Sequence, residues 1–290
     1  MKNYIVLLFD FLLIPVLAIS QEMKQDSIQD KQELPAFEST TLIDNPTNLL
    51  FDKKTLEVMM QHRFGTINGG TNDLIGIYGA ANIRLGLSYA IHDRLTLGFG
   101  TTKLKSYQDF NWKVGILKQT RSGKIPVNVS YYGNFVIDAR NKGRGLFPTK
   151  QSRYSYFHQL IISRRFSPKL SLQVAPSVSH YNLTEARMPN DVVALAVGGR
   201  FKITDQTAIL VDYSHPFVHH LNKDEFKGID PEPGFSLGVE FSTSGHAFQL
   251  FLSNYWGIVP QENYRYNKNK FSNGFTDILI GFNITRNYNF

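Results

Sequence analysis

ANIRLGLSYAI, residues 81–91, alternates strictly between two kinds of side chain. Its odd-numbered positions carry Ala, Ile, Leu, Leu, Tyr and Ile, and its even-numbered positions carry Asn, Arg, Gly, Ser and Ala. Successive side chains of a β-strand point to opposite faces, so this strand would have one apolar and one polar or small face. The stretch therefore predicts a strand with lipid on one side and a polar interior on the other, as in a transmembrane β-barrel.

The same period of two recurs in residues 170–178 and 235–241 and continues to the last residue. Further strands are predicted near 55–65, 94–104, 108–120, 126–138, 153–166, 191–203, 206–215, 246–256 and 274–290. Residues 153–166 fit either phase. Together these segments predict an all-β fold, an antiparallel up-and-down transmembrane barrel of about twelve strands.

The connections between the predicted strands alternate in length. The long ones are 66–78, 139–152, 181–190, 216–233 and 257–273, and the short ones are 92–93, 122–123, 167–169, 204–205 and 244–245. Residues 105–107 are a short exception. Bacterial outer-membrane barrels have short periplasmic turns and long extracellular loops, so we expect both chain ends on the periplasmic side.

The N-terminal residues predict export and three segments. Residues 1–20 resemble a cleaved signal peptide, with Lys2 before an apolar core and Ala18-Ile19-Ser20 at the cleavage site. Asp10 and Pro15 interrupt that core, which argues against the alternative of a membrane anchor. Residues 21–54 are expected to form a periplasmic segment, either flexible or a partial plug, and residues 55–290 the barrel. The predicted location is therefore the outer membrane of a Gram-negative bacterium.

The net charge is +7 and the sequence has no cysteine, so stability rests on the strand ladder and on packing. A basic helix, an aromatic RNA-binding signature and a zinc motif are all missing from the sequence, so a nucleic-acid partner is not expected. Basic residues gather in the loop 139–152, which is without an acid. We expect such loops to contact lipid and the anionic lipopolysaccharide of the outer membrane.

Aromatic residues add two features. They cluster where the strands meet the loops, as in the aromatic belts of membrane proteins. The C-terminal segment FNITRNYNF, residues 282–290, alternates and ends on Phe. Its candidate signal for the barrel-assembly machinery consists of Phe282, Ile284, Tyr288 and Phe290.

Two short motifs carry a family resemblance. His62-Arg63-Phe64-Gly65, followed by Asn82-Ile83-Arg84-Leu85-Gly86-Leu87, resembles an uncharacterised family of exported β-barrel proteins, a domain of unknown function. The resemblance covers most of the mature chain. It implies an outer-membrane barrel and carries no established activity.

The polar phase of the strands supplies the candidate lumen-lining residues. They are Glu57, Arg63, Asn82, Arg84, Lys113, Asp138, Arg200, Lys202, Asp212, Glu240 and Asp277. Acids and bases nearly cancel, which favours an interior ion-pair network over a charge-selective channel. Arg63 and Arg84 should face Asn82 and Gln61 across the first hairpin. They could bind a carboxylate or phosphate, or they could pair with Asp73 or Glu57; we favour the latter.

Catalytic and metal chemistry has weak support. His215, His219 and His220 share one loop and could bind a metal, although few acids are near. His158 with Ser155 or Ser163 could serve a lipid hydrolase, but the sequence has no nucleophile motif. No cofactor, metal or catalytic residue is therefore predicted, and the protein is not expected to be an enzyme.

The preferred function is a channel or transporter for a small solute. Polar and glycine residues in the inward phase motivate this hypothesis. The alternative is a non-conducting barrel that acts through its basic extracellular loops as a structural or surface-binding protein. A lipid-acting hydrolase of the outer membrane is a third possibility.

Overall fold

A computed structural model describes residues 30–290 apart from 142, 144, 186–187 and 219–229. The chain divides into two units, Met1–Lys31 and Gln32–Phe290, and the second contains every strand described below. The predicted signal peptide, residues 1–20, lies outside the described residues.

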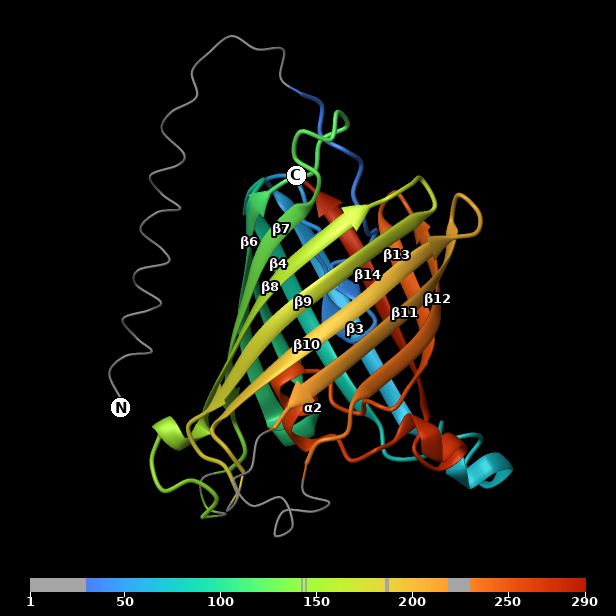
Figure 1. The fold of residues 1–290 in the computed structure, drawn as a ribbon. Coiled ribbons are helices and arrows are strands. Elements are labelled where there is room, and N and C mark those ends of the chain that lie inside the picture. Colours follow the sequence, from blue (N-terminus) through green and yellow to red (C-terminus); the bar gives the residue numbers. More distant parts are fainter. Residues whose placement is uncertain (1–29, 142, 144, 186–187, 219–229) are drawn as a thin grey trace. The chain divides into compact units, whose positions relative to one another are not determined.

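Twelve strands close into a barrel in the described part of the chain (Figure 1). Each strand is antiparallel to its neighbours in sequence, and β14 pairs with β3 to complete the ring. The strands are β3 (Thr55–Thr66), β4 (Asn82–His92), β5 (Leu95–Thr102), β6 (Tyr107–Leu117), β7 (Asn128–Asp138), β8 (Tyr154–Arg165), β9 (Leu170–Tyr181), β10 (Asp191–Lys202), β11 (Thr207–Phe217), β12 (Gly234–Thr243), β13 (His246–Ser253) and β14 (Leu279–Asn289). The predicted strand number and up-and-down topology are confirmed.

Short elements complete the described fold. Two strands, β1 (Thr41–Leu42) and β2 (Asn45–Pro46), form a hairpin of their own. The helical elements are η1 (Ile67–Asn72), η2 (Leu104–Ser106), η4 (Gln151–Arg153), α2 (Pro260–Tyr266) and η5 (Phe271–Thr276). A helix of sufficient length and apolarity to cross a membrane does not occur among these.

The two faces of the wall have the predicted phase. In β4, Leu85 and Leu87 are 51% and 50% exposed, whereas Asn82 and Ala90 are fully buried. The barrel therefore exposes apolar side chains outward and buries polar ones inward, which is the reverse of a water-soluble fold and suits a surrounding of lipid. Gln61 lies opposite Arg84, and Arg63 opposite Asn82, as the sequence predicts.

The ends of the barrel differ in the length of their connections. Both the start of β3 and the end of β14 lie at the short-turn end, where Thr55 pairs with Asn289. Long connections follow β3, β7, β9, β11 and β13 at the other end. One short turn is longer than predicted, because β6 ends at Leu117 and β7 begins at Asn128.

Candidate functional site

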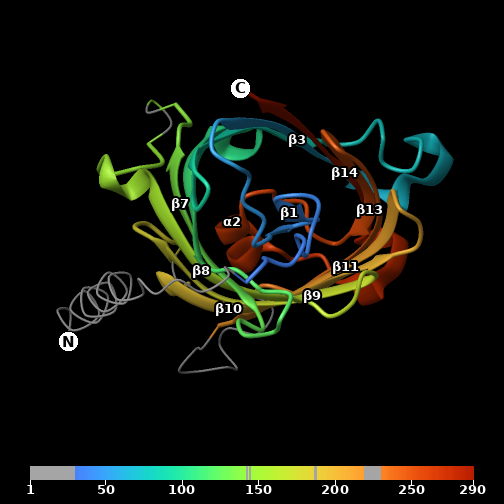
Figure 2. The ribbon, with the colours of Figure 1, turned by 90° about the horizontal axis from the view of Figure 1, so that it is seen from above.

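Residues 36–54, which we call the N-terminal plug, fill part of the lumen and end at the short-turn rim, where residues 52–54 are exposed. This segment precedes β3 and turns back into the ring, so that β1 lies inside the circle of strands when the barrel is seen along its axis (Figure 2). The tight turn of its hairpin consists of Ile43 and Asp44, between the paired residues Leu42 and Asn45. Ile43 has a φ of +53°, which is unfavourable for a β-branched residue. Contacts with the wall must therefore stabilise this turn.

Four wall residues, which we call the seat, bind the tip of the plug. They are Arg63, Asp212, Ser236 and Ser253. One carboxylate oxygen of Asp44 lies 3.0 Å from Nη2 of Arg63. The other accepts hydrogen bonds from the hydroxyls of Ser236, at 2.5 Å, and Ser253, at 3.2 Å. Both Arg63 and Asp44 are almost completely buried, so loss of either partner would leave an uncompensated charge in the lumen.

Asp212 binds the same turn from another side. Its carboxylate accepts the backbone N–H groups of Asp44, at 3.0 Å, and Asn45, at 3.1 Å. The side-chain amide of Asn45 donates a third hydrogen bond, at 2.9 Å. Asp212 is 2% exposed, and among the described residues it forms no ion pair within 4.0 Å. Uncharged groups of the plug therefore supply these three hydrogen bonds to a buried carboxylate.

Wall side chains also bind the backbone of the plug. The donors and the carbonyls that accept from them are Lys113 with Thr40 and Leu49, Gln173 with Pro46, Gln249 with Thr41, and Asn283 and Arg63 with Ile43. Buried carbonyls need such partners, because an unsatisfied buried polar group costs about 1–3 kcal/mol. The polar wall therefore satisfies the backbone of a segment that is not part of the sheet.

An apolar cluster packs on one side of the plug. Its members are Ala36, Phe37, Leu42 and Ile43 of the plug with Leu210 and Phe251 of the wall. The guanidinium of Arg63 lies 4.4 Å from the ring centroid of Phe251. A Cβ at Gly281 would come within 2.5 Å of that ring, so the glycine makes room for the aromatic side chain. Packing and hydrogen bonding thus act together on the plug.

A second segment enters the lumen from the long-loop end. We call residues 254–267 the α2 loop; its helix α2 lies inside the ring in Figure 2. The hydroxyl of Tyr264 donates a hydrogen bond of 2.5 Å to Oδ1 of Asn45. Burial raises the pKa of the Tyr264 phenol, so the group stays protonated and keeps its role as donor. The two inserted segments therefore meet each other within the barrel.

Glu262 fastens the α2 loop to the rim. Its carboxylate lies 2.8 Å from Nζ of Lys105 and accepts the hydroxyl of Tyr107 at 2.6 Å. The Lys105 ammonium also lies 3.9 Å from the ring centroid of Tyr266. Lys105 has a φ of +53°, so the short β5–β6 connection adopts a strained conformation where it meets α2.

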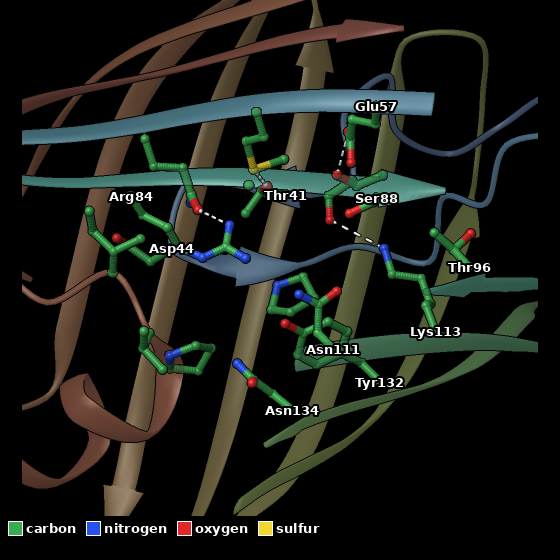
Figure 3. A pocket seen from close by; sticks show the side chains of 18 of the residues that line it. Thr41, Asp44, Glu57, Arg84, Ser88, Thr96, Asn111, Lys113, Tyr132 and Asn134 are labelled. Atoms are coloured by element: carbon green, nitrogen blue, oxygen red, sulfur yellow. Dashed lines mark hydrogen bonds between the residues drawn. The ribbon is translucent and has the colours of Figure 1, made fainter. Parts of the chain in front are cut away.

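A cavity of about 70 Å³ remains between the plug, the α2 loop and the wall of β3–β7 (Figure 3). Glu57 borders it and accepts the hydroxyl of Thr40 at 2.7 Å. Lys113 of β6 also borders it and donates to the carbonyl of Thr40 at 3.3 Å. Thr96 and Asn134 also line it, and each has a buried oxygen without a hydrogen-bond partner among the described residues. A polar space of this size accommodates several water molecules, at about 10–15 Å³ each.

Most of the predicted lumen residues are brought together in ion pairs or hydrogen bonds. Their contacts are Glu57 with Thr40, Arg63 with Asp44, Asn82 with the Trp256 carbonyl, Arg84 with Asp109, Lys113 with two plug carbonyls, Asp138 with Arg140, Arg200 with Glu240, Lys202 with Asp205, and Asp212 with the plug turn. Lys202 and Asp138 lie at opposite ends of the barrel wall. Asn82 also lies at the long-loop end, as the first residue of β4.

Two expectations need correction. Asp277 does not line the lumen: it follows η5 in the β13–β14 connection, where it binds the backbone N–H of Lys270 and the amide of Asn273. The helical conformation of η5 ends the sheet at Leu279, so β14 is shorter than predicted. Arg63 and Arg84 do not pair with Asp73 or Glu57, because Asp44 and Asp109 lie closer.

The residues that the sequence analysis missed are Asp44, Asn45, Asp109 and the α2 loop. Asp109 shares the phase of Lys113 in the same strand, so the period of two could have identified it. Asp44 lies in a segment without periodicity, and only the turn signal Asn45-Pro46 marks it.

The residues considered for catalysis are separated in the structure. His158 lies on the outer face of β8, where Nδ1 is 2.5 Å from the hydroxyl of Tyr131. Ser155 and Ser163 are buried on the inner face of the same strand, so neither pairs with His158. Groups of three or more metal-ligating side chains do not occur in the described part of the chain, and His219 and His220 lie outside it.

The C-terminal residues lie on the outer side. Phe282 stacks on His62 at 5.1 Å between ring centroids, and Ile284 shares its phase in β14. Tyr288 is 38% and Phe290 77% exposed. All four predicted signal residues are thus accessible from the lipid side or the short-turn end.

Comparisons with known proteins agree with this fold. The family model described as membrane bound beta barrel domain (DUF5777) matches residues 37–288. No curated protein matches the chain in sequence. The solved NanC porin has a TM-score of 0.50 and 9% identity, over 81% of this chain and 100% of the porin.

Two further solved structures are less similar. An outer-membrane channel from Pseudomonas putida F1 has a TM-score of 0.48 and 11% identity, over 91% of this chain and 100% of the channel. Outer membrane phospholipase A from Escherichia coli, an active-site mutant, has a TM-score of 0.43 and 10% identity, over 93% and 96%. At such identities the likeness concerns the fold alone.

Proposed function

Since the chain belongs to the family of membrane-bound β-barrel domains, we propose that it is an outer-membrane channel for small solutes that its own N-terminal plug closes. The plug and the α2 loop meet through Tyr264 and Asn45, and the cavity between them and the wall of β3–β7 is only about 70 Å³. A solute therefore passes only after the plug has moved.

One observation carries this proposal: polar groups of the wall bind the backbone of an inserted segment. Lys113, Gln173 and Gln249 each donate to a plug carbonyl. In a barrel closed by its wall alone, such side chains would pair with one another across the lumen. Withdrawal of the plug would leave a polar passage that water can fill, which a hydrophilic solute requires.

The charges of that passage are nearly balanced. Arg84 pairs with Asp109 at 2.7 Å, and Arg200 pairs with Glu240 at 2.8 Å. These pairs remain when the plug leaves, because both partners belong to the wall. The open channel should therefore discriminate weakly between small anions and cations.

The location and partners follow from the outer surface. Apolar residues such as Leu85 and Leu97 face outward from the strands, which fits a lipid environment. The C-terminal aromatic residues would engage the barrel-assembly machinery, and loop 139–152 would contact lipopolysaccharide. Arg140 of that loop forms an ion pair with Asp138, so the other basic residues of the loop would make the contacts with lipopolysaccharide.

A non-conducting barrel is the second candidate. It is favoured by the buried Arg63–Asp44 pair and by the apolar cluster around Phe251, since both hold the plug in place. In that case the plug would be a permanent part of the core, and the protein would act through its loops.

Solute flux into proteoliposomes separates the candidates. We would compare the natural chain with Asp44→Ala/Asn45→Ala, which removes the polar side chains at the tip of the plug but leaves the wall intact. The channel predicts faster liposome swelling in a small sugar for the variant, by tenfold or more. A gel shift between unboiled and boiled samples shows that both proteins are folded. Equal swelling of both at the background level would then favour the non-conducting barrel.

A further inference from the structure

At the tip of the plug, the single residue Asp44 presents two chemical groups to the seat. The side-chain carboxylate of Asp44 binds Arg63, Ser236 and Ser253, while its backbone N–H binds Asp212. Along the covalent chain, two carbons separate that nitrogen from that carboxyl carbon. The same separation occurs between the amino nitrogen and the carboxyl carbon of a β-amino acid.

The two sides of the seat carry opposite kinds of ionisable group. Arg63, a fully buried guanidinium, binds the carboxylate, and its Nε has no hydrogen-bond partner among the described residues. Asp212, an equally buried carboxylate, receives only uncharged donors from the plug. An ammonium would make stronger, charge-assisted hydrogen bonds to Asp212 than these amides do. The seat is thus better suited to a free zwitterion than to the peptide groups it holds.

The backbone supports the same interpretation. Ile43, next to Asp44, has a φ of +53° although its side chain is fully buried. Its carbonyl accepts from Arg63 at 3.2 Å and from Asn283 at 2.9 Å, which stabilises the strained turn. Strain of this kind is often found where a chain is held in a binding site.

We infer that the seat is a solute-binding site for a small β-amino acid, and that Asp44 with Asn45 occupies it as an internal substitute. This inference rests on the proposed function, since it names the solute class that the channel would recognise. Arg63 with the two serines binds the carboxylate of the solute, and Asp212 binds its ammonium. Because the plug is tethered, it competes at a high effective concentration, and the free solute binds the natural chain weakly.

Binding of radiolabelled β-alanine to the purified full-length protein in detergent tests the inference. Equilibrium dialysis compares the natural chain with Asp44→Ala/Asn45→Ala, and the gel shift confirms that each is folded. We expect at least tenfold tighter binding to the variant, because the Asp44 carboxylate no longer occupies Arg63 and the serines and the Asn45 amide no longer binds Asp212. Asp44→Asn, which retains the size of the side chain, provides a second and milder variant with an intermediate affinity.

Competition defines the chemical class. Unlabelled β-alanine should compete at least tenfold better than propionate or propylamine, each of which offers only one of the two groups. In the vacated background, Arg63→Gln and Asp212→Asn should each weaken binding by tenfold or more. Lys202→Gln, at the short-turn rim, is the matched control and should change nothing. Equal competition by the three compounds, or no effect of either seat substitution, would overturn the inference.

Equilibrium dialysis measures binding without requiring conduction. The binding-site proposal and the channel proposal can therefore be refuted independently. Binding of β-alanine without flux through proteoliposomes would retain the site and refute the channel. Flux through the vacated variant without such binding would retain the channel and refute the site.

Discussion

The Tyr264 hydroxyl donates a hydrogen bond of 2.5 Å to Oδ1 of Asn45, so a residue from one end of the barrel binds a residue from the other. Asn45 in turn donates to Asp212 and Ser214 through its amide nitrogen. The α2 loop and the N-terminal plug are therefore coupled, and a change in one should alter the position of the other.

Removal of that hydroxyl should loosen the plug. Tyr264→Phe leaves the buried oxygen of Asn45 without this donor, at a cost of about 1–3 kcal/mol. The chain has no natural cysteine, so Ala36→Cys, a position that is 1% exposed, can report exposure of the plug to a maleimide. We expect labelling to be at least fivefold faster in Tyr264→Phe. Tyr78→Phe is the control, because Tyr78 is 77% exposed, and an equal increase there would contradict the coupling.

The Arg63–Asp44 pair should show strong energetic coupling. Loss of one partner of a buried ion pair typically costs about 3–5 kcal/mol, whereas loss of both costs less. We therefore expect Asp44→Asn to loosen the plug more than Asp44→Asn with Arg63→Gln, measured by maleimide labelling of Ala36→Cys over a range of urea concentrations. Additive effects of the two substitutions would mean that the contact contributes little.

Gly281→Ala should displace the wall side of the plug. The added Cβ would lie 2.5 Å from the Phe251 ring and 2.9 Å from Cδ of Arg63, so both side chains must shift. Overpacking of this kind costs about 1–3 kcal/mol. Faster labelling of Ala36→Cys is the expected result. Gly245→Ala, in an open turn whose nearest neighbour is 3.9 Å away, should leave the labelling rate unchanged.

Glu262→Gln should release the α2 loop from the rim. Its carboxylate is 7% exposed and pairs with Lys105, whereas the more exposed Glu232 pairs with Lys270. Buried charged hydrogen bonds contribute about 1.5–3 kcal/mol, and exposed ion pairs often contribute under about 1 kcal/mol. Hydrogen exchange of the α2 amides should therefore accelerate at least tenfold in Glu262→Gln and by little in Glu232→Gln. The reverse order would show that the rim contact does not hold α2.

The sequence predicts the wall of this barrel well, because lipid on one face forces a period of two on every strand. Residues 153–166 fit either phase because apolar residues occur on both faces of β8. Phe157 and Ile161 face inward and are fully buried, and the ring of Phe157 packs 5.7 Å from that of Tyr264. Apolar residues thus occur on the inner face of β8 where α2 covers it, which weakens the alternation.

The contents of the lumen could not be predicted in the same way. Asp44 meets Arg63 and Asp212 only after the barrel has closed, and no local pattern encodes contacts between residues so distant in sequence. The α2 loop could not be distinguished from an extracellular loop, since its burial depends on the width of the barrel. Asp109 differs, because its place in the inward phase was readable from the strand itself.

Closure of the barrel by residues 36–54 can be tested most directly by tethering the plug. Thr40 and Glu57 touch at 2.7 Å, so Thr40→Cys/Glu57→Cys places two thiols across the plug and the wall. These changes are combined with Asp44→Ala/Asn45→Ala, and single-channel currents are recorded before and after a short bis-maleimide cross-linker, which alkylates both thiols, is added. Thr40→Cys alone, in the same background and with the same reagent, is the control. We predict conductance steps that disappear on cross-linking only in the double-cysteine protein; steps that persist after complete cross-linking would contradict closure by the plug.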